Sequence, residues 1–154
     1  MSESLSVTTC LWFEKKGIEA ARYYVSVTPG SRLLTHAKEG ESPMFVDFEL
    51  GGVPYRILNG GLHYKLNPDC SIAVTTQSQA ATDHIWDALI SDGGEAGRCG
   101  WLVDRWGVSW QVFPAALATM LGASDREAAG RAQEAMMGMG KIDIEKMQAA
   151  FDAV

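Results

Sequence analysis

The order of the expected helices and strands repeats along the chain, and this repeat limits the fold more than any other feature. Hydrophobic periodicity and glycine or proline turn signals define the elements of each half. The first half is expected to contain a strand at 8–13, a helix at 18–25 and strands at 31–37, 44–50 and 53–59. The second half is expected to repeat this with a strand at 70–75, a helix at 78–91 and strands at 99–103 and 108–113. Each half leaves a sheet face to bury, so we expect the halves to pair as one cupped sheet with helices outside.

The predicted fold class is therefore α+β, with tandem strand–helix–strand modules in a cupped mixed sheet and helices at the C-terminal end. Module one covers about residues 7–60 and module two about 69–114, and a helical tail covers 115–154. A length of 154 residues suits one domain, so we expect residues 1–154 to form a single domain.

The tail carries two signals for helix starts. Ser124 and Glu127 predict a capping box, in which the hydroxyl and the carboxylate satisfy free amide groups. Asp143 predicts the cap of a last helix, with Ile142 and Met147 placed as a hydrophobic staple.

Composition excludes several classes of function. The net charge is −6 and the 13 basic residues are scattered, which argues against a nucleic-acid partner. No apolar stretch approaches the length of a membrane span, and the polar start does not resemble a secretory signal. Three cysteines, Cys10, Cys70 and Cys99, lack paired spacing, which favours a reducing cytoplasm.

The segment Cys99–Gln111 is predicted to hold two strands around a tight turn, with three tryptophans that indicate a heavily used aromatic wall. Strand alternation places Gln111 with Ser109 and Phe113 on one face, and Trp110 on the other.

These residues resemble a known family. Leu11-Trp-Phe13, Glu19-Ala-Ala21, Tyr23-Tyr24 and Pro29-Gly-Ser-Arg32 resemble the opening of PhnB-like proteins. Asn59-Gly-Gly61, the block Cys99–Gln111 and the closing Lys141-Ile-Asp-Ile144 match other signatures of that family. The family is labelled demethylubiquinone methyltransferase-like and belongs to the glyoxalase/bleomycin-resistance superfamily, also called vicinal oxygen chelate. The resemblance implies paired βαβββ modules, a homodimer and a small organic molecule bound in the cup.

Superfamily enzymes hold a divalent metal with His and Glu side chains, and this chain departs from that pattern. By the resemblance, the ligand positions fall near Thr8 and Asn59, at Cys70 or Ser71, and on Gln111. Amide and hydroxyl oxygens are weaker ligands than imidazole or carboxylate, so we expect no confidently bound cofactor, with a divalent metal as the alternative.

Five residues are candidates for contact with the bound molecule: Trp12, Asn59, His63, Trp101 and Gln111. Each also has a structural interpretation: a core tryptophan, a turn asparagine, a solvated loop histidine or a buried amide. No residue is assigned a catalytic role.

Three functions remain open at this point. The leading one is a small-molecule-binding protein without the usual metal site. The first alternative is a metal-dependent lyase, isomerase or dioxygenase. The second is a methyltransferase, which depends on the family label alone, because no Gly-x-Gly-x-x-Gly turn joins a strand to a helix.

Overall fold

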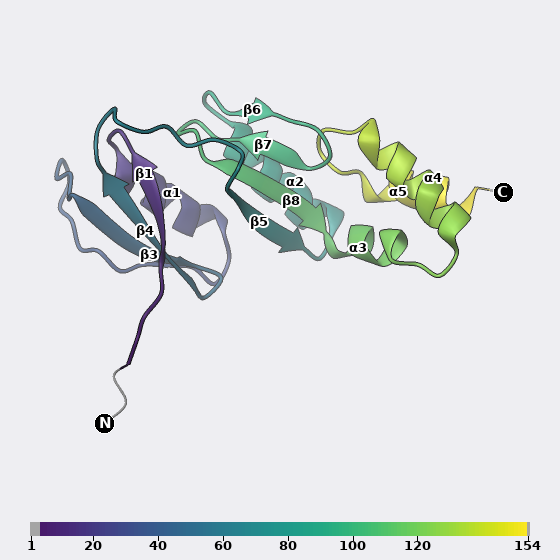
Figure 1. The fold of residues 1–154 in the computed structure, drawn as a ribbon, viewed down its shortest axis with the longest axis horizontal. Coiled ribbons are helices and arrows are strands. Elements are labelled where there is room, and N and C mark those ends of the chain that lie inside the picture. Colours follow the sequence, from purple (N-terminus) through teal and green to yellow (C-terminus); the bar gives the residue numbers. More distant parts are fainter. Residues whose placement is uncertain (1–3, 154) are drawn as a thin grey trace. The chain divides into compact units, whose positions relative to one another are not determined.

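The structure is a computed structural model that describes residues 4–153 (Figure 1). Two compact units divide the chain between Leu66 and Asn67. The first unit contains β1 (Thr9–Phe13), α1 (Gly17–Val27), β2 (Arg32–Leu33), β3 (Phe45–Leu50) and β4 (Val53–Asn59). The second contains β5 (Ser71–Thr76), α2 (Gln79–Ile90), β6 (Glu95–Ala96), β7 (Trp101–Val103), β8 (Ser109–Pro114), α3 (Ala115–Leu121), α4 (Arg126–Met137) and α5 (Ile144–Asp152).

Each unit has its own four-stranded mixed sheet, and the two sheets have the same topology. The strand order is β1-β4-β3-β2 in the first and β5-β8-β7-β6 in the second. In both, the first strand runs parallel to the last, and the other pairs are antiparallel. The α+β class with tandem βαβββ modules and C-terminal helices is confirmed.

One face of each sheet packs against a helix. In the first unit, Val46, Phe48 and Ile57 are fully buried and alternate with exposed or half-buried neighbours, and Ala21 and Tyr24 of α1 are buried with them. In the second unit, Trp110 and Val112 are fully buried. This period of two is the pattern expected for a strand with one face in a core.

The hairpin between β3 and β4 forms as the sequence predicts. Gly51 and Gly52 have φ of 53° and 85°, which glycine adopts without the steric cost of a side chain. The predicted bounds of β4 match the observed strand.

Three strands differ from the prediction. The strand expected at 99–103 begins only at Trp101, because Cys99 and Gly100 have positive φ. The strand expected at 31–37 is only Arg32–Leu33, because the amides of Leu34 and Thr35 both donate to the carbonyl of Asp47 and the ladder stops there. The strand β6 was not predicted, because its two exposed residues, Glu95 and Ala96, carry no hydrophobic pattern.

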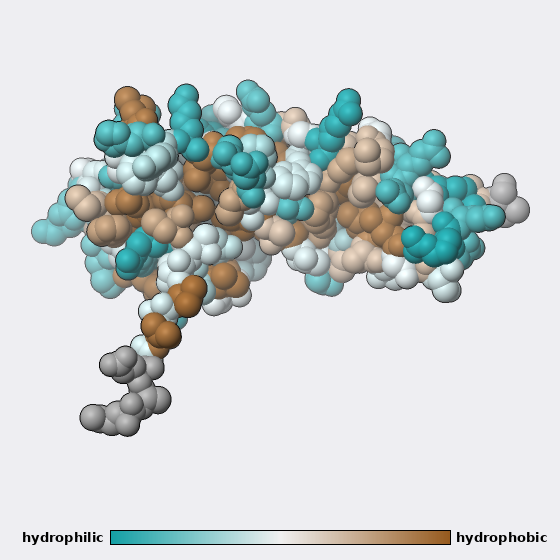
Figure 2. Space-filling model, viewed as in Figure 1, coloured by the Kyte–Doolittle hydropathy of each residue, from teal (hydrophilic) through white to brown (hydrophobic). Residues whose placement is uncertain are grey.

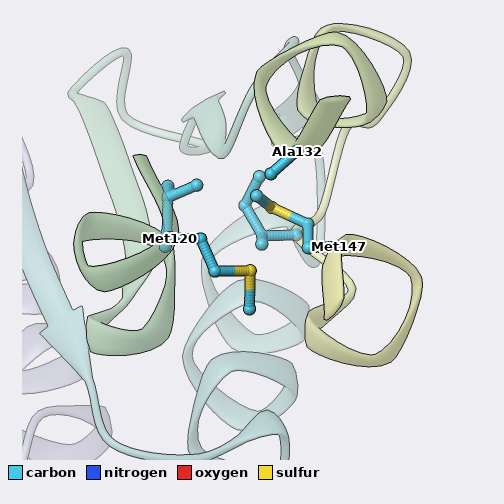
Figure 3. Packing of buried hydrophobic residues seen from close by; sticks show 5 residues of the cluster. Met120, Ala132 and Met147 are labelled. Atoms are coloured by element: carbon cyan, nitrogen blue, oxygen red, sulfur yellow. The ribbon is translucent and has the colours of Figure 1, made fainter. Parts of the chain in front are cut away.

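The C-terminal helices enclose a small hydrophobic cluster (Figure 3). Leu117 and Met120 of α3, Ala132 of α4, and Ile142 and Met147 around the start of α5 form its buried part. Ile142 and Met147 are 0% and 1% exposed, as the predicted staple requires.

The predicted capping box at Ser124 is wrong by one residue. Asp125 is the cap of α4, and its carboxylate accepts hydrogen bonds from the amides of Glu127 and Ala128 at 3.1 and 3.0 Å. A carboxylate is favoured over a hydroxyl here because it also interacts with the positive end of the helix dipole.

Asp143 caps α5 as predicted, accepting from the amide of Lys146 at 3.0 Å. We expect Asp143→Ala to lower the free energy of unfolding by about 1 kcal/mol at pH 7. The backbone hydrogen bond from Lys146 is the largest of the causes that lower the pKa of Asp143 in the folded protein. The stabilisation is therefore complete above the ordinary pKa of about 4 and disappears as the pH falls through the lower folded value.

Urea unfolding of both proteins between neutral and acidic pH measures this difference. Asp152→Ala is the control, because its carboxylate lies at the end of the same helix and, within residues 4–153, accepts only from Gln148. A difference between wild type and Asp143→Ala that grows toward low pH would contradict the assignment.

Across residues 4–153, no helix is both long enough and apolar enough to span a membrane. Figure 2 shows that hydrophobic residues are exposed among hydrophilic ones on the face that it draws.

Candidate functional site

The face of the second sheet opposite α2 brings two of the predicted site residues together. Gln111 in the middle of β8 is the direct cross-strand partner of Trp101 on β7 and of Ala73 on β5. We call this surface the distal face. Its strand positions are Ser71, Ala73, Thr75, Glu95, Trp101, Val103, Ser109, Gln111 and Phe113.

Alternation along β8 explains why Gln111 lies here. Trp110 and Val112 are fully buried on the α2 side, whereas Gln111 and Phe113 between them are half-buried. A shift of one residue would bury the amide and expose the tryptophan, so the register is strongly determined.

The Gln111 side chain is held by one hydrogen bond. Its Nε2 donates to the Oγ of Ser71 at 2.7 Å. No described residue donates to its carbonyl oxygen, and the Ser71 hydroxyl keeps its own proton to donate. The pair therefore presents an acceptor and a donor next to each other.

Ser109 adds a second hydroxyl to the same face. It is the cross-strand partner of Ser71 and precedes Gln111 by two residues. Its side chain is 2% exposed, and its Oγ has no hydrogen-bond partner among the described residues. Buried polar groups in proteins are nearly always hydrogen-bonded, so an exception requires an explanation.

The three tryptophans do not form one wall, which corrects the prediction. Trp101 is half-buried and belongs to the distal face. Trp110 is fully buried on the opposite side, with its indole N–H donating to Asp104 at 2.8 Å. Trp106 lies in the turn, where the Arg105 guanidinium stands 4.9 Å from its ring centroid.

Asp104 organises the turn between β7 and β8. One carboxylate oxygen accepts from the amides of Trp106 and Val108 at 2.9 and 3.0 Å, and the other from Trp110. The side chain is 3% exposed. Asp104 thus fixes the turn and the direction of Trp110, and with it which face Gln111 occupies.

In the first unit, Trp12 holds the loop after β4. Its indole N–H donates to the carbonyl of Gly61 at 2.9 Å, and the ring of Tyr64 meets it edge-on with centroids 4.8 Å apart. A Cβ on Gly60 would lie 2.4 Å from the Trp12 ring, so the loop requires glycine there.

Asn59 joins the start of α1 to the loop before β3. Its Oδ1 accepts from the amide of Gly17 at 2.9 Å, and its Nδ2 donates to the carbonyl of Pro43 at 2.7 Å. Both ends of the amide are thus used within the first unit. His63 is exposed in the loop that follows.

The residues at the expected metal positions do not fit a divalent cation. Asn59 is engaged as above, Gln111 donates to Ser71, and Cys70 is an exposed free thiol. Thr8 and Ser71 offer only neutral hydroxyls, whereas protein sites for zinc or manganese need imidazole, thiolate or carboxylate. Within residues 4–153, no group of three His, Cys, Asp or Glu side chains could hold an ion.

Comparison with known proteins identifies relatives of this arrangement. Residues 5–113 match the protein family described as 3-demethylubiquinone-9 3-methyltransferase. No curated protein sequence matches the chain.

Solved structures share the fold. A putative 3-demethylubiquinone-9 3-methyltransferase, the PhnB protein from Bacillus cereus, is 25% identical with a TM-score of 0.62, covering 72% of this chain and all of that one. A glyoxalase/bleomycin resistance protein/dioxygenase family enzyme from Burkholderia phytofirmans PsJN is 10% identical with a TM-score of 0.52, covering 70% of this chain and 95% of that one. A glyoxalase-related enzyme from Fulvimarina pelagi is 12% identical with a TM-score of 0.50, covering 73% and 91%.

The family match covers most of the chain, and the βαβββ modules agree with the fold of these neighbours. The chain therefore belongs to the family described as 3-demethylubiquinone-9 3-methyltransferase, and it shares its fold with a PhnB protein and with glyoxalase-related enzymes.

Proposed function

We propose that the distal face binds a small, uncharged, planar molecule through Trp101, Gln111, Ser71 and Ser109. The observation that carries this proposal is the buried Ser109 hydroxyl without a partner, next to the Gln111–Ser71 pair. A ligand that accepts from the hydroxyls and donates to the Gln111 carbonyl would satisfy all three groups.

The charges on the strands that form the distal face limit the class of ligand. No residue of β5, β7 or β8 is ionisable at neutral pH, and the edge strand β6 places the exposed carboxylate of Glu95 opposite Val103 on the same face. A phosphate or carboxylate would leave water without a countercharge, which costs free energy. The half-buried ring of Trp101 instead favours a flat apolar body, and the polar groups then determine its orientation.

The other predicted functions have less support. A metal-dependent lyase, isomerase or dioxygenase would need ligands that the donor set does not offer. Methyl transfer depends on the description of the family, and a shared fold does not establish a shared activity. Whether the bound molecule undergoes a reaction stays open in this proposal.

The other predictions from the sequence are kept as part of this proposal. Trp12, Asn59 and His63 stay predicted ligand contacts, although Asn59 would have to give up hydrogen bonds to reach a ligand. A single domain over 1–154, a homodimer and a cytoplasmic location likewise stay predictions.

Benzamide is the probe that tests the site, because its ring is flat and its amide has one donor and one acceptor edge. We expect Gln111→Ala to weaken benzamide binding about tenfold, the loss of one or two hydrogen bonds. Ser109→Ala should weaken it similarly without lowering stability, because the hydroxyl has no partner to lose in the free protein.

NMR titration suits this experiment, since so small a ligand binds at best in the micromolar to millimolar range. Gln148→Ala is the matched control, an exposed glutamine on α5 whose amide donates, among the described residues, to Asp152 alone. Benzoate, which is charged, and acetophenone, which lacks the donor, should both bind more weakly than benzamide. Equal affinity of wild type and Gln111→Ala, or no benzamide binding at millimolar concentration, would refute the site.

A further inference from the structure

We infer that the segment 139–144, which leads from α4 into α5, acts as a clamp that positions Trp101. The loop that this clamp holds is 97–101, which enters β7. The inference rests on the proposed function insofar as Trp101 contacts the ligand. It adds a part of the chain that lies beyond the residues matching the family, 5–113.

Two backbone hydrogen bonds join the clamp to the loop. The amide of Cys99 donates to the carbonyl of Met139, and the amide of Gly100 donates to the carbonyl of Gly140, both at 2.8 Å. The two donors are consecutive residues, and so are the two acceptors. The clamp therefore binds the loop at two adjacent positions.

The loop needs an external partner because its backbone is unusual. Cys99 has φ of 55°, which residues with a side chain adopt only rarely, and Gly100 follows with φ of 81°. Such conformations persist only where surrounding contacts hold them. The two amides that donate to the clamp belong to these two residues.

The clamp is itself fixed to α2. The side chain of Gln79 donates to the carbonyl of Ile142 at 3.0 Å and accepts from the amide of Ile144 at 2.8 Å. Lys141 lies 3.1 Å from both Asp83 and Asp87. The clamp is therefore bound to α2 on one side and to the loop 97–101 on the other.

Movement of the loop would reach the distal face directly. The carbonyl of Trp101 accepts from the amide of Gly97, and the carbonyl of Gly100 accepts from Val112, the residue after Gln111. A displaced loop would therefore move Trp101 and loosen β8 beside Gln111.

Two glycines of the tail provide a matched test. A Cβ on Gly140 would lie 3.2 Å from the carbonyl oxygen of Gly97, so in Gly140→Ala the loop at Gly97 has to give by a few tenths of an ångström. A Cβ on Gly138 would meet nothing closer than 3.6 Å, which is ordinary contact. Gly138→Ala is therefore the control for the same change two residues away.

The readout in the ligand-free protein is amide hydrogen exchange at Cys99 and Gly100, together with the indole N–H resonance of Trp101. We expect Gly140→Ala to speed exchange at both amides about tenfold and to shift the Trp101 resonance, and Gly138→Ala to change neither. We also expect benzamide affinity to fall about threefold or more in Gly140→Ala only. Unchanged exchange or an unchanged Trp101 resonance would overturn the clamp.

A second pair of variants covers the case in which Gly140→Ala does not fold. Gln79→Leu removes one of the two anchors on α2, the other being Lys141 with Asp83 and Asp87, and should produce the same changes to a smaller extent, while Gln148→Leu should produce none. If wild type does not bind benzamide, the proposed function fails. The amide exchange rates and the Trp101 resonance still test whether the segment 139–144 holds the loop. If exchange and resonance change but benzamide affinity does not, the positioning role fails and the proposed site stands.

Discussion

Asp104→Ala is expected to lower the free energy of unfolding by about 3–4 kcal/mol, because it removes the acceptor of three hydrogen bonds in a buried place. The amides of Trp106 and Val108 and the indole of Trp110 would lose their partner. Water cannot easily replace it, since the carboxylate is only 3% exposed. Urea unfolding followed by far-UV circular dichroism measures the loss.

Asp47→Ala is the matched control for Asp104→Ala. Asp47 also forms two side-chain hydrogen bonds, to Arg56 at 2.6 and 2.9 Å, but on the surface of the first unit. Exposed ion pairs contribute up to about 1 kcal/mol, so Asp47→Ala should cost less than that. Similar losses for the two variants would show that Asp104 does not organise the turn.

Local patterns in the sequence were enough to predict the element order apart from β6, and the face on which Gln111 lies. The alternation from Ser109 to Phe113 has a period of two, and a one-residue shift would expose Trp110, so no other register was plausible. The glycine pair at 51–52 likewise determines a hairpin without reference to the rest of the chain. These signals act over a few residues and can be read directly from the sequence.

The partners within the site could not be predicted in this way, because they depend on strand pairing between distant segments. Ser71 and Gln111 are 40 residues apart, and only the register of β5 against β8 shows that their side chains meet. Asn59 similarly holds Gly17 across 42 residues, which a reading of Asn59 as a turn residue does not reveal. Ser109 was placed on the correct face, but its burial without a partner depends on packing.

The family description and the site point to different chemistry. A methyltransferase or a metal-dependent enzyme would need groups that bind a cofactor, whereas the distal face offers neutral hydroxyls, an amide and an indole ring, with the single carboxylate of Glu95 on its edge strand. These groups are suited to recognition of a neutral molecule. A site of this kind can hold a ligand without activating it, which is why binding rather than turnover is the property to measure first.

Gly100→Ala is expected to lower the free energy of unfolding by about 3 kcal/mol or more, for two separate reasons. Its φ of 81° disfavours any side chain, at a cost of about 1–2 kcal/mol. In addition, the new Cβ would lie 2.7 Å from the Phe113 ring and 2.8 Å from the carbonyl oxygen of Val112. Crowding of this kind costs a further 1–3 kcal/mol or so, because the neighbouring backbone must shift.

Gly107→Ala separates the two reasons. Gly107 has a φ of 88° in the turn of the same hairpin, but nothing lies within 4 Å of a Cβ placed there. It should therefore show only the backbone cost of about 1–2 kcal/mol. The excess loss in Gly100→Ala measures how tightly the loop packs against β8, and an excess near zero would mean that the loop yields easily. In that case Trp101 would stand on a mobile support, and the distal face would not be preorganised for its ligand.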